Sequence, residues 1–317
     1  MTFQTPVNRF LFIALFASGL LLGCTKTPMG PPPPTGTTGT IAQVLASVSN
    51  TTIYNGILTH TGLDTTLSGP GPFTVFVATD TAFTLAGFTV ANLSILPDSI
   101  LYHLITYSII DGLKLGAATL PAGPDAKIVT AGGDSIYVSN NSSGIFVNGV
   151  PVTETDVTAS NGIINTVMSP LIPAFGSLLQ TLSADTVFSF MTAAIARASQ
   201  GATNLDTILS TSPFTIFVPS NSAFQTAGFA TINDINTANP DSLARLVEEH
   251  IVPKRIFSSD FNLSNGVVAL SGSSLNILGG QIPGIKGNSN FGFIGFVSTN
   301  IMASNGVIHI ISGMLTQ

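Results

Sequence analysis

The chain contains very few charged residues for its length. Lys, Arg, Asp and Glu make up 8% of its 317 residues, against about 25% in an average soluble protein. Its net charge is −6, and it has no run of basic side chains. Because nucleic acids and anionic membranes are bound largely through clustered Lys and Arg, the sequence predicts no nucleic-acid partner and no purely electrostatic membrane binding.

Tryptophan is absent, and cysteine occurs once, at Cys24. A single cysteine allows no internal disulfide, so the folded parts must be stabilised by their hydrophobic cores. The sequence also lacks a Ser-centred nucleophile elbow, a Walker loop and an HExxH pattern. We therefore expect a protein that is not an enzyme and that has neither a cofactor nor a metal site.

The N-terminus reads as a targeting segment. Arg9 precedes an apolar stretch at 10–22 that is too short to span a bilayer. The stretch ends in Leu-Leu-Gly-Cys24, which resembles the lipobox of bacterial lipoproteins; an ordinary secretory signal is the alternative. We expect a signal peptide at 1–23, a lipidated Cys24 and a Pro-, Gly- and Thr-rich tether at 24–40. The residue directly after Cys24 is not acidic, which resembles lipoproteins sent to the outer membrane. Whether the protein faces the periplasm or the cell surface is left undetermined by the sequence.

An eleven-residue stretch occurs twice, at Phe73–Phe83 and Phe214–Phe224, with six identical positions. Each copy reads as a buried strand that runs directly into a capped helix, with Asp80 and Asn221 at matching cap positions. A strand-to-helix signal repeated at this distance predicts two copies of one domain. We place them at 41–173 and 175–317.

A second matched feature is a helix that begins at Pro-Asp-Ser in each copy and carries a histidine, His103 or His250. We pair these two histidines, allowing one extra helical turn in the second copy, and expect both on the apolar face. A satisfied core histidine is the main interpretation, and a metal ligand or general base is the alternative. Glu248 and Glu249 are expected on the solvated face of the same helix.

Each copy closes on Ala-Ser-Asn-Gly followed by aliphatic residues, with Asn161-Gly162 in the first copy and Asn305-Gly306 in the second. We expect positive φ at this turn, a tight hairpin and a terminal strand behind it. His309 lies in the terminal strand of the second copy, where the first copy has Asn165.

Taken in order, these motifs resemble the fasciclin (FAS1) domain. The resemblance implies an α+β fold with two tandem FAS1-like domains, each a β-sandwich or wedge with a group of helices packed on it. The departures are Asn165, where the family has His, and Glu249-His250, where it has Tyr-His. The Tyr102-His103 pair resembles a segment implicated in ligand contact in animal members of the family.

The resemblance implies a non-catalytic adhesion or protein-interaction module, held at the bacterial envelope by the lipid on Cys24. Its partner would be an unknown protein or an extracellular-matrix or glycan component. The alternatives are a lipoprotein that binds polysaccharide or a small ligand for nutrient capture, and a purely structural spacer. The matched motif residues are interpreted as scaffold, and these are Asp80, Asn221, Asn161, Gly162, Asn305, Gly306 and His309.

Overall fold

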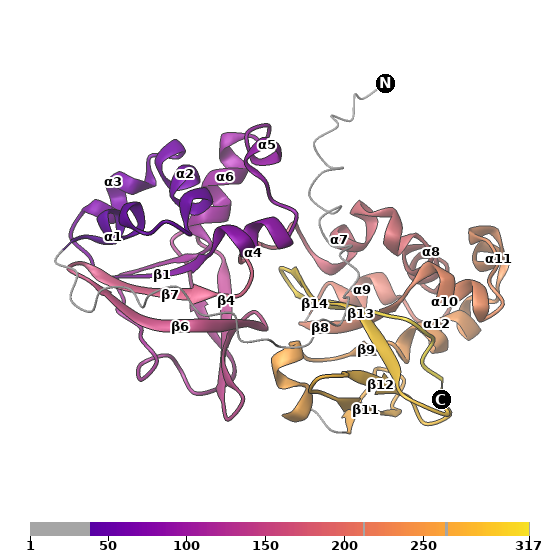
Figure 1. Cartoon of the computed structure of the whole chain (residues 1–317). Coiled ribbons are helices and arrows are strands. Elements are labelled where there is room, and N and C mark those ends of the chain that lie inside the picture. Colours follow the sequence, from indigo (N-terminus) through magenta and orange to yellow (C-terminus); the bar gives the residue numbers. More distant parts are fainter. Residues whose placement is uncertain (1–38, 212, 264–265, 317) are drawn as a thin grey trace. The chain divides into compact units, whose positions relative to one another are not determined.

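The computed structural model describes residues 39–211, 213–263 and 266–316. The predicted signal peptide, Cys24 and nearly all of the predicted tether lie outside these ranges. The chain forms two compact units, with the division between Pro173 and Ala174. In each unit a group of helices packs on one seven-stranded sheet (Figure 1). The α+β fold class expected from the sequence is confirmed.

The first unit begins with short helices and ends with a run of strands. Its strand order is β2-β1-β7-β6-β5-β4-β3. The helices are α1 (Ile41–Ser47), α2 (Thr52–His60), α3 (Leu63–Ser68), α4 (Asp80–Leu85), α5 (Val90–Leu93) and α6 (Asp98–Thr106). The strands are β1 (Phe73–Ala78), β2 (Ile109–Asp111), β3 (Gly123–Val129), β4 (Ser135–Asn141), β5 (Gly144–Val147), β6 (Val150–Ala159) and β7 (Gly162–Val167).

The second unit repeats this plan with the strand order β10-β11-β12-β13-β14-β8-β9. Its helices are α7 (Leu178–Ala184), η3 (Thr186–Phe188), α8 (Ser189–Ala198), α9 (Leu205–Leu209), α10 (Asn221–Thr226), α11 (Ile232–Thr237), α12 (Pro240–Glu248) and η4 (Ser258–Leu263). Its strands are β8 (Phe214–Pro219), β9 (Ile251–Val252), β10 (Val267–Val268), β11 (Ser274–Leu278), β12 (Gly284–Lys286), β13 (Ile294–Ala303) and β14 (Gly306–Ile311).

The repeated stretch forms β1 or β8, which is the second strand from one edge of its sheet, and the helix that follows it. All six residues of β1 and all six of β8 are buried, as a run of apolar and β-branched residues predicts. The Thr79 side chain accepts the backbone N–H of Ala82 at the start of α4, and Ser220 accepts that of Ala223 at the start of α10. The expected strand and capped helix are therefore present in both copies.

The strands β1 and β8 each pair in parallel with the last strand of their own unit. Phe73 of β1 lies opposite Gly162 of β7, and Phe214 of β8 lies opposite Gly306 of β14. The hairpin that leads into each last strand has two loop residues, because Ala159 pairs with Gly162 and Ala303 pairs with Gly306. This parallel pair places the Asn-Gly motif at one end of β1 and of β8.

Among the described residues, no single helix has the length and apolarity needed to cross a membrane. The segments Leu178–Ala184 and Thr186–Ala198 reach that threshold only together, and a bend of 106° separates them. Both contribute buried apolar side chains to the core of the second unit.

Candidate functional site

One asparagine in each unit joins three segments that are far apart in sequence. Asn161 accepts the backbone N–H of Ile41 with its Oδ1 at 2.9 Å and donates from Nδ2 to the carbonyls of Leu67 and Gly69, each at 2.8 Å. It thereby ties the start of α1 and the end of α3 to the last hairpin. Buried backbone groups need such partners, so this amide closes the helical layer onto the sheet.

Asn305 makes the same connection in the second unit. Its Oδ1 accepts the N–H of Leu178 at 2.8 Å, and its Nδ2 donates to the carbonyl of Leu209 at 2.6 Å. Both asparagines use the donor and the acceptor of the side-chain amide inside their own unit. They act as internal connections of the fold.

The glycine that follows each asparagine is required by close packing. An alanine Cβ at Gly162 would lie 2.2 Å from the Phe73 carbonyl oxygen, and one at Gly306 would lie 2.2 Å from that of Phe214. Neither glycine has the positive φ that the Ser-Asn-Gly pattern led us to expect. That expectation is wrong, because what these positions need is a missing side chain beside a neighbouring strand.

Asp80 and Asn221 each bind a neighbouring helix. The Asp80 carboxylate accepts the N–H of Thr52 at 3.1 Å and that of Ile53 at 2.7 Å, at the start of α2. Asn221 accepts the N–H of Phe190 at 3.4 Å and donates to the Thr186 carbonyl at 3.1 Å, where η3 meets α8. These contacts satisfy helix-terminal groups that would otherwise lack partners.

His309 lies fully buried in β14, beside Phe217 of β8. Its Nε2 donates to the Ile256 carbonyl at 2.8 Å, while its Nδ1 accepts the N–H of Asn300 at 3.3 Å. These partners fix the neutral tautomer with the proton on Nε2. Burial lowers the pKa of His309 from 6.5 to about 4, although the bond to Ile256 opposes this shift.

Asn165 occupies the matching position in the first unit, because it pairs with Phe76 of β1. Its Nδ2 donates to the Leu115 carbonyl at 3.1 Å, and its Oδ1 accepts the N–H of Asp156 at 3.2 Å. Asp156 and Asn300, the residues whose amides are bound, have φ of 66° and 64°. Asn165 and His309 therefore hold the same distorted stretch of the preceding strand, and the departure from the family pattern preserves both hydrogen bonds.

His250 is also buried and neutral. Its Nδ1 donates to the Leu246 carbonyl at 2.8 Å, and its Nε2 accepts the N–H of Leu315 at 2.9 Å. Burial lowers the pKa of His250 to about 4, although the bond to Leu246 opposes this shift. Both ring nitrogens are occupied within the unit, which favours the core interpretation over a metal ligand or general base.

The pairing of His103 with His250 is wrong. The backbone N–H of Phe217 binds the His250 carbonyl, and the equivalent N–H of Phe76 binds the carbonyl of Ser108. Ser108 is therefore the counterpart of His250, and His103 lies about one helical turn earlier. The Ser108 hydroxyl bonds the phenol of Tyr54 at 2.8 Å, and burial raises the pKa of Tyr54.

His103 does not lie on a buried face. Its side chain is 40% exposed and bonds through Nε2 to the carboxylate of Asp134, while Tyr102 is 50% exposed. His60 pairs with Asp98 in the same way, at 2.9 Å. Sequence spacing missed both pairs, because each joins α2 or α6 to a residue more than thirty positions away.

Glu249 corrects the expectation of a solvated acidic pair. It is only 1% exposed, and its Oε2 accepts the hydroxyl of Ser271 at 2.6 Å. Its counterpart is Tyr107, whose phenol also lies inside the first unit and binds the Ser135 carbonyl. Both positions turn inward just before the short strand β2 or β9 begins.

Within the described ranges, no three His, Cys, Asp or Glu side chains are grouped so that they could hold a metal ion. The side chains marked by both copies of the motif instead bind backbone groups of their own unit. The profile of the Fasciclin domain matches residues 49–173 and 188–317, and these ranges include Asp80, Asn161, Asn221, Asn305 and His309. The chain belongs to the fasciclin domain family.

Several curated proteins are similar to this chain in sequence. The chain is 25% identical over 259 residues to transforming growth factor-beta-induced protein ig-h3 of Sus scrofa, covering 78% of the chain and 35% of that protein. It is 30% identical over 181 residues to Stabilin-1 of Mus musculus, covering 54% of the chain and 7% of that protein. The chain thus spans about a third or less of the length of these two relatives.

A bacterial relative is nearer in size. Protein sll1483 of Synechocystis sp. is 26% identical over 140 residues, which cover 44% of the chain and 72% of that protein. Among solved structures, the FAS1 domain pair of the insect cell adhesion molecule Fasciclin I aligns with a TM-score of 0.40 and 17% identity. That alignment covers 84% of the chain and 96% of the insect pair.

Proposed function

We propose that this tandem fasciclin protein is a non-catalytic adhesion or protein-interaction module, held at the bacterial outer membrane by a lipid on Cys24. The observation that carries the proposal is the use of the motif residues. The polar side chains of the motif residues form hydrogen bonds within their own unit. These residues are Asn161, Asn305, Asp80, Asn221 and His309. Such residues build a scaffold, and recognition is left to the weakly charged surface around them.

Membership of the fasciclin family supports the same proposal, because proteins of this family are generally non-catalytic adhesion modules. Two units on one tether would act together, so that modest affinity at each unit is multiplied by the local concentration of the other. Few charges mean little electrostatic steering, and the contact is expected to depend on shape and on apolar surface.

Adhesion can be tested with variants that disrupt one unit or both. Cells displaying the wild-type chain are expected to adhere to one another or to matrix-coated surfaces. Gly162→Ala or Gly306→Ala alone should reduce adhesion by roughly a hundredfold, as the loss of bivalent binding predicts, and the double variant should abolish it. Gly295→Ala serves as the matched control. Wild-type adhesion by the double variant, or tight binding of one defined oligosaccharide on a glycan array, would contradict the adhesion proposal.

The anchor has its own test. Growth with a palmitate analogue is expected to label the wild-type protein and to leave Cys24→Ser unlabelled, because Cys24 is the only cysteine in the chain. The labelled protein should partition with outer-membrane vesicles. Equal labelling of Cys24→Ser would refute lipidation at this residue without affecting the adhesion proposal.

A further inference from the structure

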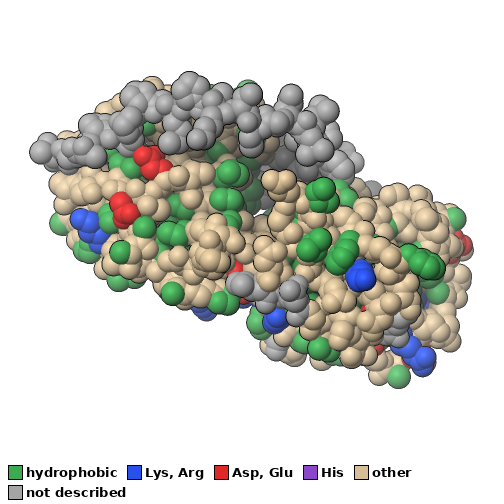
Figure 2. Space-filling view, turned by 60° about the horizontal axis from the view of Figure 1, so that its bottom comes forward, with side chains coloured by type: hydrophobic (Ala, Val, Ile, Leu, Met, Phe, Trp, Pro, Cys, Tyr) green, Lys and Arg blue, Asp and Glu red, His purple; other side chains and the backbone are tan. Residues whose placement is uncertain are grey.

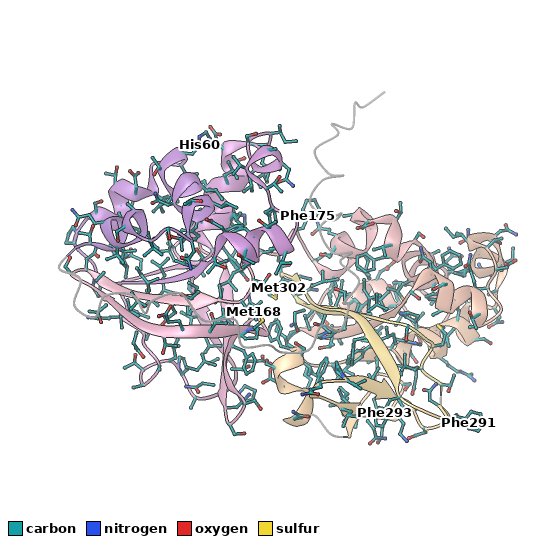
Figure 3. All side chains as sticks on the ribbon, viewed as in Figure 1. His60, Met168, Phe175, Phe291, Phe293 and Met302 are labelled. Carbon is teal, nitrogen blue, oxygen red and sulfur yellow. The ribbon has the colours of Figure 1, made fainter. Side chains whose placement is uncertain are left out.

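An apolar patch lies on the outer face of β11, β12 and β13 in the second unit. Burial alternates along β11, so that Leu275 and Ile277 enter the core while Leu278 faces outward. Phe291 and Phe293 are exposed in the β12–β13 connection, and Val297 is exposed on β13. Figure 3 shows Phe291 and Phe293 on the outside of this unit. We call Leu278, Lys286, Phe291, Phe293 and Val297 the outer patch.

The floor of the outer patch has no side chains. Gly284 of β12 lies opposite Gly295 of β13, whereas the corresponding pair in the first unit is Phe146 and Pro151. A Cβ on Gly284 would lie 2.8 Å from the Cβ of Phe293. Phe293 therefore packs against Gly284, and its side chain is half-exposed. Phe291, two residues earlier, is fully exposed.

The segment that forms the outer patch carries a single charged side chain, and the Glu249 carboxylate that approaches Gly287 is buried. Between residues 261 and 317 the only charged side chain is Lys286, and its Nζ lies 5.3 Å from the centre of the Phe293 ring. Every acidic residue of the second unit precedes this segment, and the last of them, Asp260, is buried. Figure 2, which brings this end of the unit forward, shows hydrophobic side chains dispersed among uncharged polar ones and a few charged ones.

This combination suits an anionic lipid surface. Phe and Leu side chains on an interfacial apolar face are buried at the boundary between headgroups and acyl chains, and a lysine beside them is attracted to lipid phosphates. A chain of net charge −6 would be repelled by such a surface elsewhere. A second copy of the patch would bring two Lys286 side chains together, which disfavours self-association through this face.

We propose that the outer patch rests on an anionic lipid surface, with Phe291 entering the headgroup region and Lys286 contacting phosphate. The proposal builds on the membrane anchor proposed above, because a tethered chain is held within reach and a weak contact is then enough. The contact would orient the second unit, leaving its acidic helical segments directed away from the lipid.

The absence of tryptophan makes the test direct. Phe291→Trp gives the full chain a single fluorescent reporter at the patch, and Tyr102→Trp gives a matched reporter at an exposed position of the first unit. Each chain is coupled through Cys24 to a maleimide lipid in vesicles of phosphatidylethanolamine and phosphatidylglycerol. The chemical coupling makes the result independent of lipidation in cells, so failure of the anchor and failure of the patch are distinguishable.

The reporter at 291 is expected to shift its emission to shorter wavelength and to become quenched by bromine-labelled lipid, while the reporter at 102 stays as in water. Adding Lys286→Gln should lower the ratio of docked to undocked chain roughly fivefold, the effect of one lysine near an anionic surface. The proposal would be overturned by no shift at 291 or by equal shifts at 291 and 102. It would also be overturned if the reporter at 291 shifted equally on vesicles of uncharged phosphatidylcholine and on the anionic vesicles. A shift that grows with protein concentration without vesicles would assign the face to a second copy and would also overturn it.

Discussion

Gly306→Ala is expected to unfold the second unit while the first unit stays folded. The new Cβ would lie 2.2 Å from the Phe214 carbonyl oxygen and 2.7 Å from Cδ1 of Leu178. Relief requires the parallel pair β8–β14 to separate, since the clash is with backbone. Such a change belongs to the class that costs more than about 4 kcal/mol, a large part of the roughly 5–15 kcal/mol that stabilises a domain.

Hydrogen exchange read by mass spectrometry separates the two units, because their peptides are distinct. Gly306→Ala should accelerate exchange throughout the second unit, including β8 and β14, and leave the first unit protected, and Gly162→Ala should do the reverse. Gly295→Ala is the control, since its nearest foreign atom, the Ser312 Oγ, would lie at 3.8 Å. Protection of β8 and β14 equal to wild type in Gly306→Ala would show that the strands tolerate the added methyl group.

Acidification is expected to destabilise the second unit more than the first. The pKa of His309 lies near 4 in the folded unit and at its ordinary 6.5 when exposed. The unfolded state therefore binds an extra proton between these values, so stability falls as the pH drops from about 6.5 towards 4. Between pH 7.5 and pH 5 this residue alone should cost the second unit about 2 kcal/mol. His250 should add a loss of the same sign.

The matched variant is His309→Asn, which copies Asn165 of the first unit. An asparagine can keep both hydrogen bonds, as Asn165 does with Leu115 and Asp156, but it cannot take up a proton. Thermal unfolding of the second unit should lose the His309 part of its pH dependence in this variant. Unchanged pH dependence in His309→Asn would place the acid-sensitive group elsewhere.

The sequence predicted the parts of the fold that depend on local pattern. The repeated stretch from Phe73 gave a buried strand and a capped helix, because apolar runs and cap residues act over a few positions. The Asn161-Gly162 and Asn305-Gly306 motifs were located correctly at the closing hairpins. Their contacts with α1, α3, α7 and α9 were not predictable, because those partners are 90 to 130 positions away.

The histidines show where pattern reasoning failed. Matching His103 to His250 by residue type required an inserted helical turn, but sheet register aligns Ser108 with His250. Periodicity fixes which face of a helix is apolar, yet it does not fix where the helix ends relative to the next strand. Glu249 was misplaced for the same reason, since α12 ends at Glu248 and the following residues turn into the core.

The parallel pairing of β1 with β7, and of β8 with β14, sets the order in which each unit can be completed. Phe73 meets Gly162, and Phe214 meets Gly306, so β1 and β8 lack their parallel partners until nearly the whole unit has been synthesised. Contacts between such distant segments form slowly, so each unit closes only after its last strand is available. The first unit can then close before the second has fully emerged, so that tandem copies are finished one after the other.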